Sequence, residues 1–122
     1  MAGEDFFRGY YEAYNTADPA ILGALLQDDV VLVSALGEQK GKQAYLDTYK
    51  FMTSNFIDTM RPEKITLTPD GAVVDVHDTL VARQPVDFLG RSFQPGDEMI
   101  LLVRGRYTMR GDKIARIEIW PR

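Results

Sequence analysis

Apolar residues in the first part of the chain recur at helical spacing. Between Glu4 and Ala17 they fall three and four residues apart, which places them on one helix face. Asp18-Pro19 supplies an N-cap and a first-turn proline, so a short second helix follows. A third helix is predicted from Gly41 to Phe56, where large apolar side chains lie at positions i, i+4, i+7 and i+11. These are Tyr45, Tyr49, Met52 and Phe56.

Strand patterns occupy the rest of the chain. Val30 to Ser34 is β-branched or apolar, which predicts a buried strand between the second and third helices. Beyond Arg61-Pro62 the pattern changes to period two, with short glycine-bearing turns between the runs. The alternating runs are 64–68, 72–83, 97–109 and 113–120. One α+β domain over residues 1–122 is therefore expected, with three N-terminal helices packed on a curved, mainly antiparallel sheet.

The alternation also assigns the two faces of the sheet. In the run 72–83, the more apolar set contains Val76 and Asp78 and is predicted to face the helices, which leaves His77 on the outer face. The inward sets of the last two runs are Met99, Leu101, Val103, Gly105, Tyr107, Ala115, Ile117 and Ile119. The outer face mixes arginines with apolar residues and Trp120, and such a face suits a subunit contact. A homodimer formed through it is expected.

The segment from Gln84 to Gly96 is long for a plain loop and apolar for an exposed one. Its apolar residues are Val86, Phe88, Leu89 and Phe93. An edge hairpin, or a lid over the mouth of a pocket, is predicted here.

Composition excludes several classes of function. The chain has 122 residues, a net charge of −4 and no cluster of basic residues, so nucleic acid is not an expected partner. It has no cysteine and one histidine, which rules out disulfides and a multi-histidine metal site. No run approaches eighteen apolar residues, and the acidic, tyrosine-rich start does not resemble a secretory signal. A cytoplasmic protein without membrane contact is expected.

Asp78 is the leading candidate for chemistry. A carboxyl group among apolar neighbours has a raised pKa, as a general acid or base at neutral pH requires. The alternative is a carboxylate that is solvated or paired near a strand end. Tyr10, Tyr14 and Tyr49 could donate to an oxyanion, although core packing also accounts for buried phenols. Ser34 could position a ligand or cap a strand.

Three segments resemble the nuclear-transport-factor-2-like superfamily, in its SnoaL-like branch of polyketide cyclases and ketosteroid isomerases. They are YYEAYNTADPAILGALLQDDVVLVSALG, GKQAYLDTY and GDKIARIEIWP. The resemblance implies a cystatin-like cone, a deep apolar pocket and frequent homodimers. Tyr10 falls where the steroid isomerases carry an oxyanion tyrosine, Ser34 where they carry the aspartate base, and Val103 near their second oxyanion donor. Their specific mechanism is therefore not expected in this chain.

Two functions remain open at this point. The first is a cofactor-independent isomerase, cyclase or lyase that acts on a small hydrophobic carbonyl or cyclic compound, with Asp78 moving a proton and Tyr10 or Tyr14 stabilising an oxyanion. The second is a non-catalytic protein that binds an apolar metabolite or serves as a dimeric accessory module. The candidate lining residues of the pocket are Ser34, Tyr49, Val76, Val103, Ile117 and Ile119.

Overall fold

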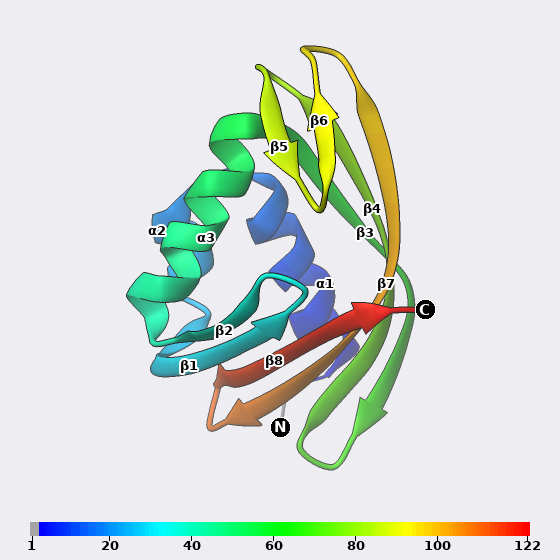
Figure 1. Ribbon diagram of the computed structural model, residues 1–122. Coiled ribbons are helices and arrows are strands. Elements are labelled where there is room, and N and C mark those ends of the chain that lie inside the picture. The colour runs from blue at the N-terminus through cyan, green and yellow to red at the C-terminus, as the bar shows by residue number, and fades with distance from the viewer. Residues whose placement is uncertain (1–2) are drawn as a thin grey trace.

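The three predicted helices are present in the computed structural model, which describes residues 3–122. They are α1 (Glu4–Asn15), α2 (Pro19–Gly23) and α3 (Lys42–Asn55). The Asp18 side chain caps α2 by accepting a hydrogen bond from the backbone N–H of Ala20, as the Asp-Pro signal predicts. All three helices lie within the hollow of one strongly curved sheet (Figure 1).

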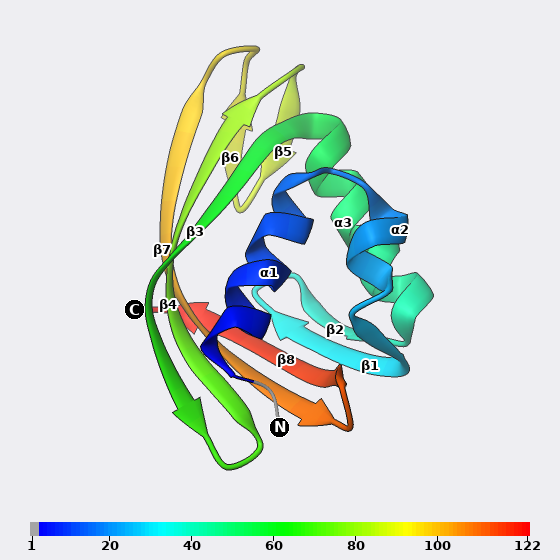
Figure 2. The same ribbon diagram turned by 180° about the vertical axis from the view of Figure 1, so that it is seen from behind.

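The curved sheet has six strands in the order β2-β1-β8-β7-β4-β3. All neighbours are antiparallel except β1 and β8, which run parallel. The strands are β1 (Leu26–Ser34), β2 (Gly37–Lys40), β3 (Phe56–Thr68), β4 (Gly71–Ala82), β7 (Glu98–Arg110) and β8 (Lys113–Pro121). The long strands β3, β4 and β7 form one wall, and β8, β1 and β2 turn beneath the helices (Figures 1 and 2). The predicted fold class is confirmed.

Two strand boundaries differ from the prediction. β3 begins at Phe56, directly after α3, rather than at Lys64. Pro62 is tolerated inside it because β3 is an edge strand, and the register with β4 shifts at Glu63. β1 also starts earlier, at Leu26, and pairs with the short β2, which the sequence pattern did not reveal.

The inward face of the sheet is the one that the alternation predicts, with one exception. Val74, Val76 and Leu80 are buried on β4, and Tyr107 is buried on β7. On β8 a register shift opposite Thr108/Met109 makes Ile114 the buried residue, whereas Ala115, which was expected inside, is only half-buried. The prediction for Ala115 was wrong because a bulge breaks strict alternation.

The segment predicted as a hairpin forms a separate two-stranded sheet, β5 (Val86–Phe88) and β6 (Arg91–Phe93). It extends above α3 beside the upper ends of β4 and β7 (Figure 1). Phe88 and Phe93 pack against the fully buried Phe56, which anchors the hairpin to the start of β3. The hairpin prediction is confirmed.

Candidate functional site

Two aspartates lie side by side on the inward face of the sheet. Asp58 on β3 pairs with Leu80 on β4, and Met60, two residues on, pairs with Asp78. Asp58 and Asp78 are therefore diagonal neighbours on adjacent strands. Asp78 is 4% exposed and Asp58 is 9% exposed, so both carboxyl groups are withdrawn from solvent.

Burial controls the charge of this pair. Removal from water, followed by the neighbouring Asp58 carboxyl group, raises the pKa of Asp78 to about 10. Burial also raises the pKa of Asp58, but hydrogen bonds from Asp78 and from Tyr14 oppose that rise. The pair therefore gives up its protons in two separate steps. Between those steps one carboxyl group is protonated and the other is ionised.

Tyr14 fixes one side of the pair. Its hydroxyl group, projecting from α1, donates to Oδ2 of Asp58 at 2.7 Å. Tyr49 on α3 donates to the backbone carbonyl of Tyr14 at 2.5 Å and so braces α1 at this point. Oδ1 of Asp58 and Oδ1 of Asp78 are both buried and accept no hydrogen bond from a protein donor in the described chain. Each could serve a ligand.

Both aspartates line an open cavity of about 180 Å³. The helices contribute Tyr14, Thr48 and Met52, and the hairpin contributes Phe88 and Leu89. The remaining lining residues, on or next to the curved sheet, are Leu32, Ser34, Ala35, Leu36, Asp58, Met60, Asp78, Leu101, Val103, Ile119, Trp120 and Pro121. No lysine, arginine or histidine of the described residues lines it.

The structure brings together some of the predicted site residues at this cavity. They are Asp78, Tyr14, Ser34, Val103 and Ile119. Tyr10 and Tyr49 lie instead at a smaller adjoining void of about 50 Å³, where the Tyr10 hydroxyl is taken up by that of Tyr45 at 2.5 Å. Val76 and Ile117 are buried in the core and line neither space.

Asp58 is the site residue that the sequence reading missed. The pattern predicts the third helix up to Phe56 and alternating strands only beyond Arg61-Pro62, so it places residues 57–63 in no element. A signal was present, because Phe56, Asp58 and Met60 alternate with exposed or polar residues at period two. Extending that alternation back to the helix end would have paired Asp58 with the strand that carries Asp78.

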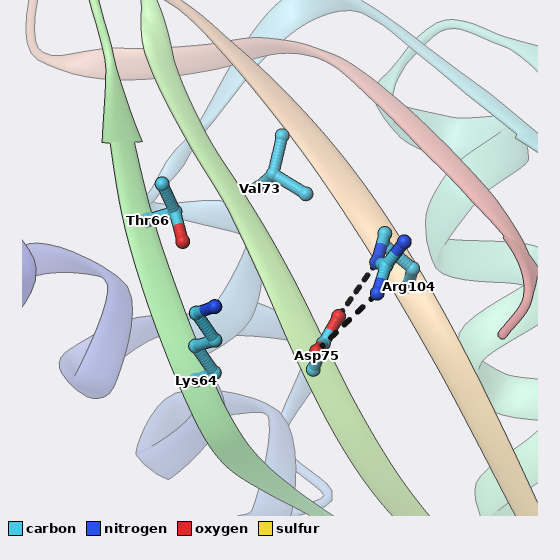
Figure 3. Close-up of a pocket in the computed structure, with 5 residues that line it drawn as sticks. All are labelled: Lys64, Thr66, Val73, Asp75 and Arg104. Carbon is cyan, nitrogen blue, oxygen red and sulfur yellow. Dashed lines mark hydrogen bonds and ion pairs between the residues drawn. The ribbon is translucent and has the colours of Figure 1, made fainter.

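The outer face of the sheet carries a second hollow of about 180 Å³, with different chemistry (Figure 3). It is lined by Lys64, Thr66, Val73, Asp75 and Arg104. Nε of Arg104 donates to Oδ1 of Asp75 at 2.7 Å, and this pairing lowers the pKa of Asp75. The Asp75 carboxylate is already paired with Arg104 and its pKa is lowered, so this hollow offers no acid or base with a pKa near neutral.

Other candidate sites are not supported in the described residues. His77 lies on the outer face, 3.3 Å from the guanidinium of Arg61, and does not line the inner cavity. Residues 3–122 contain no group of three side chains placed to hold a metal ion. No helix in the same range is both long and apolar enough to cross a membrane.

The sequence matches the SnoaL-like domain family over residues 7–117. The chain belongs to this family. No curated protein matches the sequence.

Solved structures agree on the fold. A candidate polyketide cyclase from Pseudomonas putida KT2440 is 23% identical with a TM-score of 0.79, covering 100% of this chain and 92% of its own. One from Xanthomonas campestris pv. campestris is 21% identical with a TM-score of 0.79, covering 97% and 88%. A hypothetical protein from Catenulispora acidiphila with a ketosteroid isomerase-like fold, solved with trimethylamine, is 12% identical with a TM-score of 0.79, covering 98% and 86%. At these identities the comparison establishes the fold.

Proposed function

We propose that this protein catalyses proton transfer on a small carbonyl compound, as a cofactor-independent isomerase or cyclase. One observation carries the proposal: two buried carboxyl groups, Asp58 and Asp78, share an apolar cavity and interact with each other. Buried carboxyl pairs with separated titrations are typical of acid–base sites. Membership of the SnoaL-like family supports the same class of chemistry.

The half-protonated pair holds an acid and a base together. Asp78 has the higher pKa and carries the proton, while Asp58 is the carboxylate, stabilised by the Tyr14 hydroxyl. A carbonyl oxygen bound at Oδ1 of Asp78 would accept that proton. A hydrogen on the α-carbon would then face Oδ1 of Asp58.

Enolisation follows with every proton accounted for. Asp58 removes the α-hydrogen, the C–H electron pair becomes the C=C bond, and the carbonyl π pair takes the proton of Asp78. An enol is formed, Asp58 is now protonated and Asp78 is ionised. In a substrate with a C=C bond β,γ to the carbonyl group this enol is a dienol. Return of the Asp58 proton to the γ-carbon, with loss of the enol proton to Asp78, then shifts the double bond into conjugation and restores the pair.

Deuterium exchange tests this reaction without a known substrate. NMR of cyclohexanone in D₂O, with and without protein, measures loss of the α-hydrogens. Asp58→Asn is expected to lower the protein-dependent exchange rate by about 10²- to 10⁴-fold, the usual contribution of a general base. Asp75→Asn, on the outer face of β4, serves as the control and should change little. Exchange at the rate of buffer alone, with ketone shown to be bound, would overturn the proposal.

A second candidate is non-catalytic binding of an apolar metabolite. The phenols of the core favour it, because Tyr10 is bonded to Tyr45 and Tyr11 to Tyr107, at 2.5 and 2.7 Å. These hydroxyl groups are therefore engaged in the core rather than presented to a ligand. Bound ketone without exchange would support this function.

A homodimer through the outer sheet face is also part of the proposal. The outer side exposes Ile57, Ile100 and Leu102, each by 47–52% of its surface. A contact that covers them would remove apolar area from water. Light scattering at micromolar concentration should give the dimer mass, and Ile100→Arg should give the monomer mass. A monomeric wild-type protein would refute the dimer.

A further inference from the structure

The cavity carries charge of one sign only. Its polar side chains are two carboxyl groups, the hydroxyl groups of Tyr14, Ser34 and Thr48, and the indole N–H of Trp120. With one proton on the pair, the floor of the cavity has one negative charge and no cation of the described residues beside it. A ligand carboxylate or phosphate would lose its hydration and meet a like charge without compensation. The lining therefore selects against anions.

The volume limits the ligand to about one ring. A buried apolar cavity of about 150 Å³ is known to accept benzene, and this one is about 180 Å³. The adjoining void of about 50 Å³ has room for a few water molecules but not for a second ring. A fused two-ring body would have to project through the open mouth.

Polar and apolar groups occupy different parts of the lining. Asp58, Asp78 and Tyr14 come from adjoining positions on β3, β4 and α1. The hairpin supplies only Phe88 and Leu89, and β7 supplies only Leu101 and Val103. A matching ligand has one polar end and one apolar end.

We propose that the cavity binds an uncharged, one-ring compound with a carbonyl group at one end and rejects carboxylates of the same size. This inference rests on the proposed function for its choice of a carbonyl group. The size limit comes from the cavity volume, and the charge limit from two carboxyl groups in a lining that contains no basic side chain of the described residues.

Four compounds test the ligand class: cyclohexanone, cyclohexanol, cyclohexanecarboxylate and the two-ring ketone decalone. Trp120, the only tryptophan, borders the cavity, so its fluorescence serves as the readout. Cyclohexanone is expected to bind most tightly, cyclohexanol and decalone more weakly, and the carboxylate at least about 100-fold more weakly, as like-charge contact predicts. Protein-observed NMR on the same titrations confirms where each binds.

Each outcome separates the ligand class from the catalytic proposal. Cyclohexanone binding without deuterium exchange would refute catalysis and leave the ligand class standing. Carboxylate or decalone binding as tight as that of cyclohexanone would refute the ligand class, whatever the exchange rate. As a check on cause, Asp58→Asn combined with Asp78→Asn should let the carboxylate bind more tightly, because it removes the like charge.

The tip of the hairpin carries an independent observation. Phe88 pairs with Arg91, so Leu89 and Gly90 form a two-residue loop, and both have positive φ, 50° and 76°. This is the loop in which an Asn-Gly pair is strongly favoured. A leucine with positive φ is strained by about 1–2 kcal/mol. Leu89 is nevertheless part of the cavity lining.

We infer that Leu89 limits ligand length, at a cost in local backbone energy. Leu89→Asn should leave the protein equally or more stable, yet bring the affinity for 4-tert-butylcyclohexanone closer to that for cyclohexanone. Gly90 is unchanged, so the loop geometry is kept. The ratio of the two affinities is the decisive measurement, because a purely structural role would not move it. An unchanged ratio in a folded variant would overturn the inference.

Discussion

Replacing Asp78 by asparagine should change how stability depends on pH. In the unfolded chain an aspartate loses its proton near pH 3.9, whereas burial holds the pKa of Asp78 at about 10 in the folded protein. Between these values the folded state binds one more proton than the unfolded state. Stability from this group is therefore present at low pH and is lost as pH rises, by about 1.4 kcal/mol per pH unit.

The size of the effect is large enough to measure simply. From pH 6 to pH 8 the wild-type protein should lose about 2.7 kcal/mol through Asp78, and the Asp78→Asn variant should not. The amide is nearly isosteric and can still donate to Asp58, so the neighbouring carboxyl group keeps its partner. Urea unfolding of both proteins at pH 6, 7 and 8, followed by circular dichroism, gives the two slopes.

The control is Asp75→Asn, three residues earlier on the same strand and facing outward. Its pKa is lowered by Arg104, so it stays ionised throughout this range and its removal should leave the slope unchanged. Parallel pH profiles for wild-type and Asp78→Asn proteins would show that Asp78 is ionised when folded. The acid role of Asp78 would then have to be abandoned.

Further variants test the surroundings of the pair. Tyr14→Phe removes the hydrogen bond to Asp58, so it should lower the free energy of unfolding by about 1.5–3 kcal/mol at pH 8 and slow deuterium exchange. Tyr11→Phe removes a hydrogen bond to Tyr107 instead and should leave the exchange rate unchanged. If the two variants slowed exchange equally, Tyr14 would have no specific role in the site. Gly9→Ala has free space around the new Cβ within α1 and should stabilise by about 0.5–1 kcal/mol in thermal unfolding. Gly71→Ala would place Cβ 1.8 Å from the carbonyl oxygen of Tyr107 and should destabilise strongly; a stable variant would refute that close approach.

Patterns confined to one element were readable from the sequence. Helical spacing gave α1 and α3 nearly to their ends, and the Asp18-Pro19 signal gave the start of α2. Period-two alternation gave the inward face of β4, including Asp78. Each of these elements buries one face against the core, and a buried face appears in the sequence as apolar residues at regular spacing.

Features that depend on partner strands were not readable. The bulges at Glu63 and in β8 interrupt alternation, and β2 is held by its pairing with β1 rather than by an apolar pattern. The sequence pattern missed Asp58 because a proline near the centre of a strand ordinarily argues against a strand. Only the edge position of β3 makes Pro62 acceptable, and an edge position is a property of the assembled sheet.

The bulge at Glu63 also separates the length of β3 from the face on which Asp58 lies. Asp58 and Met60 face inward before it, and Ile65 faces inward after it, so an even-numbered set gives way to an odd-numbered one. Glu63 is the extra residue, because Pro62 pairs with Val76 and Lys64 pairs with the adjacent Asp75. Deleting Glu63 while the β3–β4 turn stays in place would join Pro62 to Lys64 and leave Asp58 opposite Leu80. In a lineage with this fold, a single-codon deletion at this position would straighten β3 and keep both carboxyl groups in the cavity.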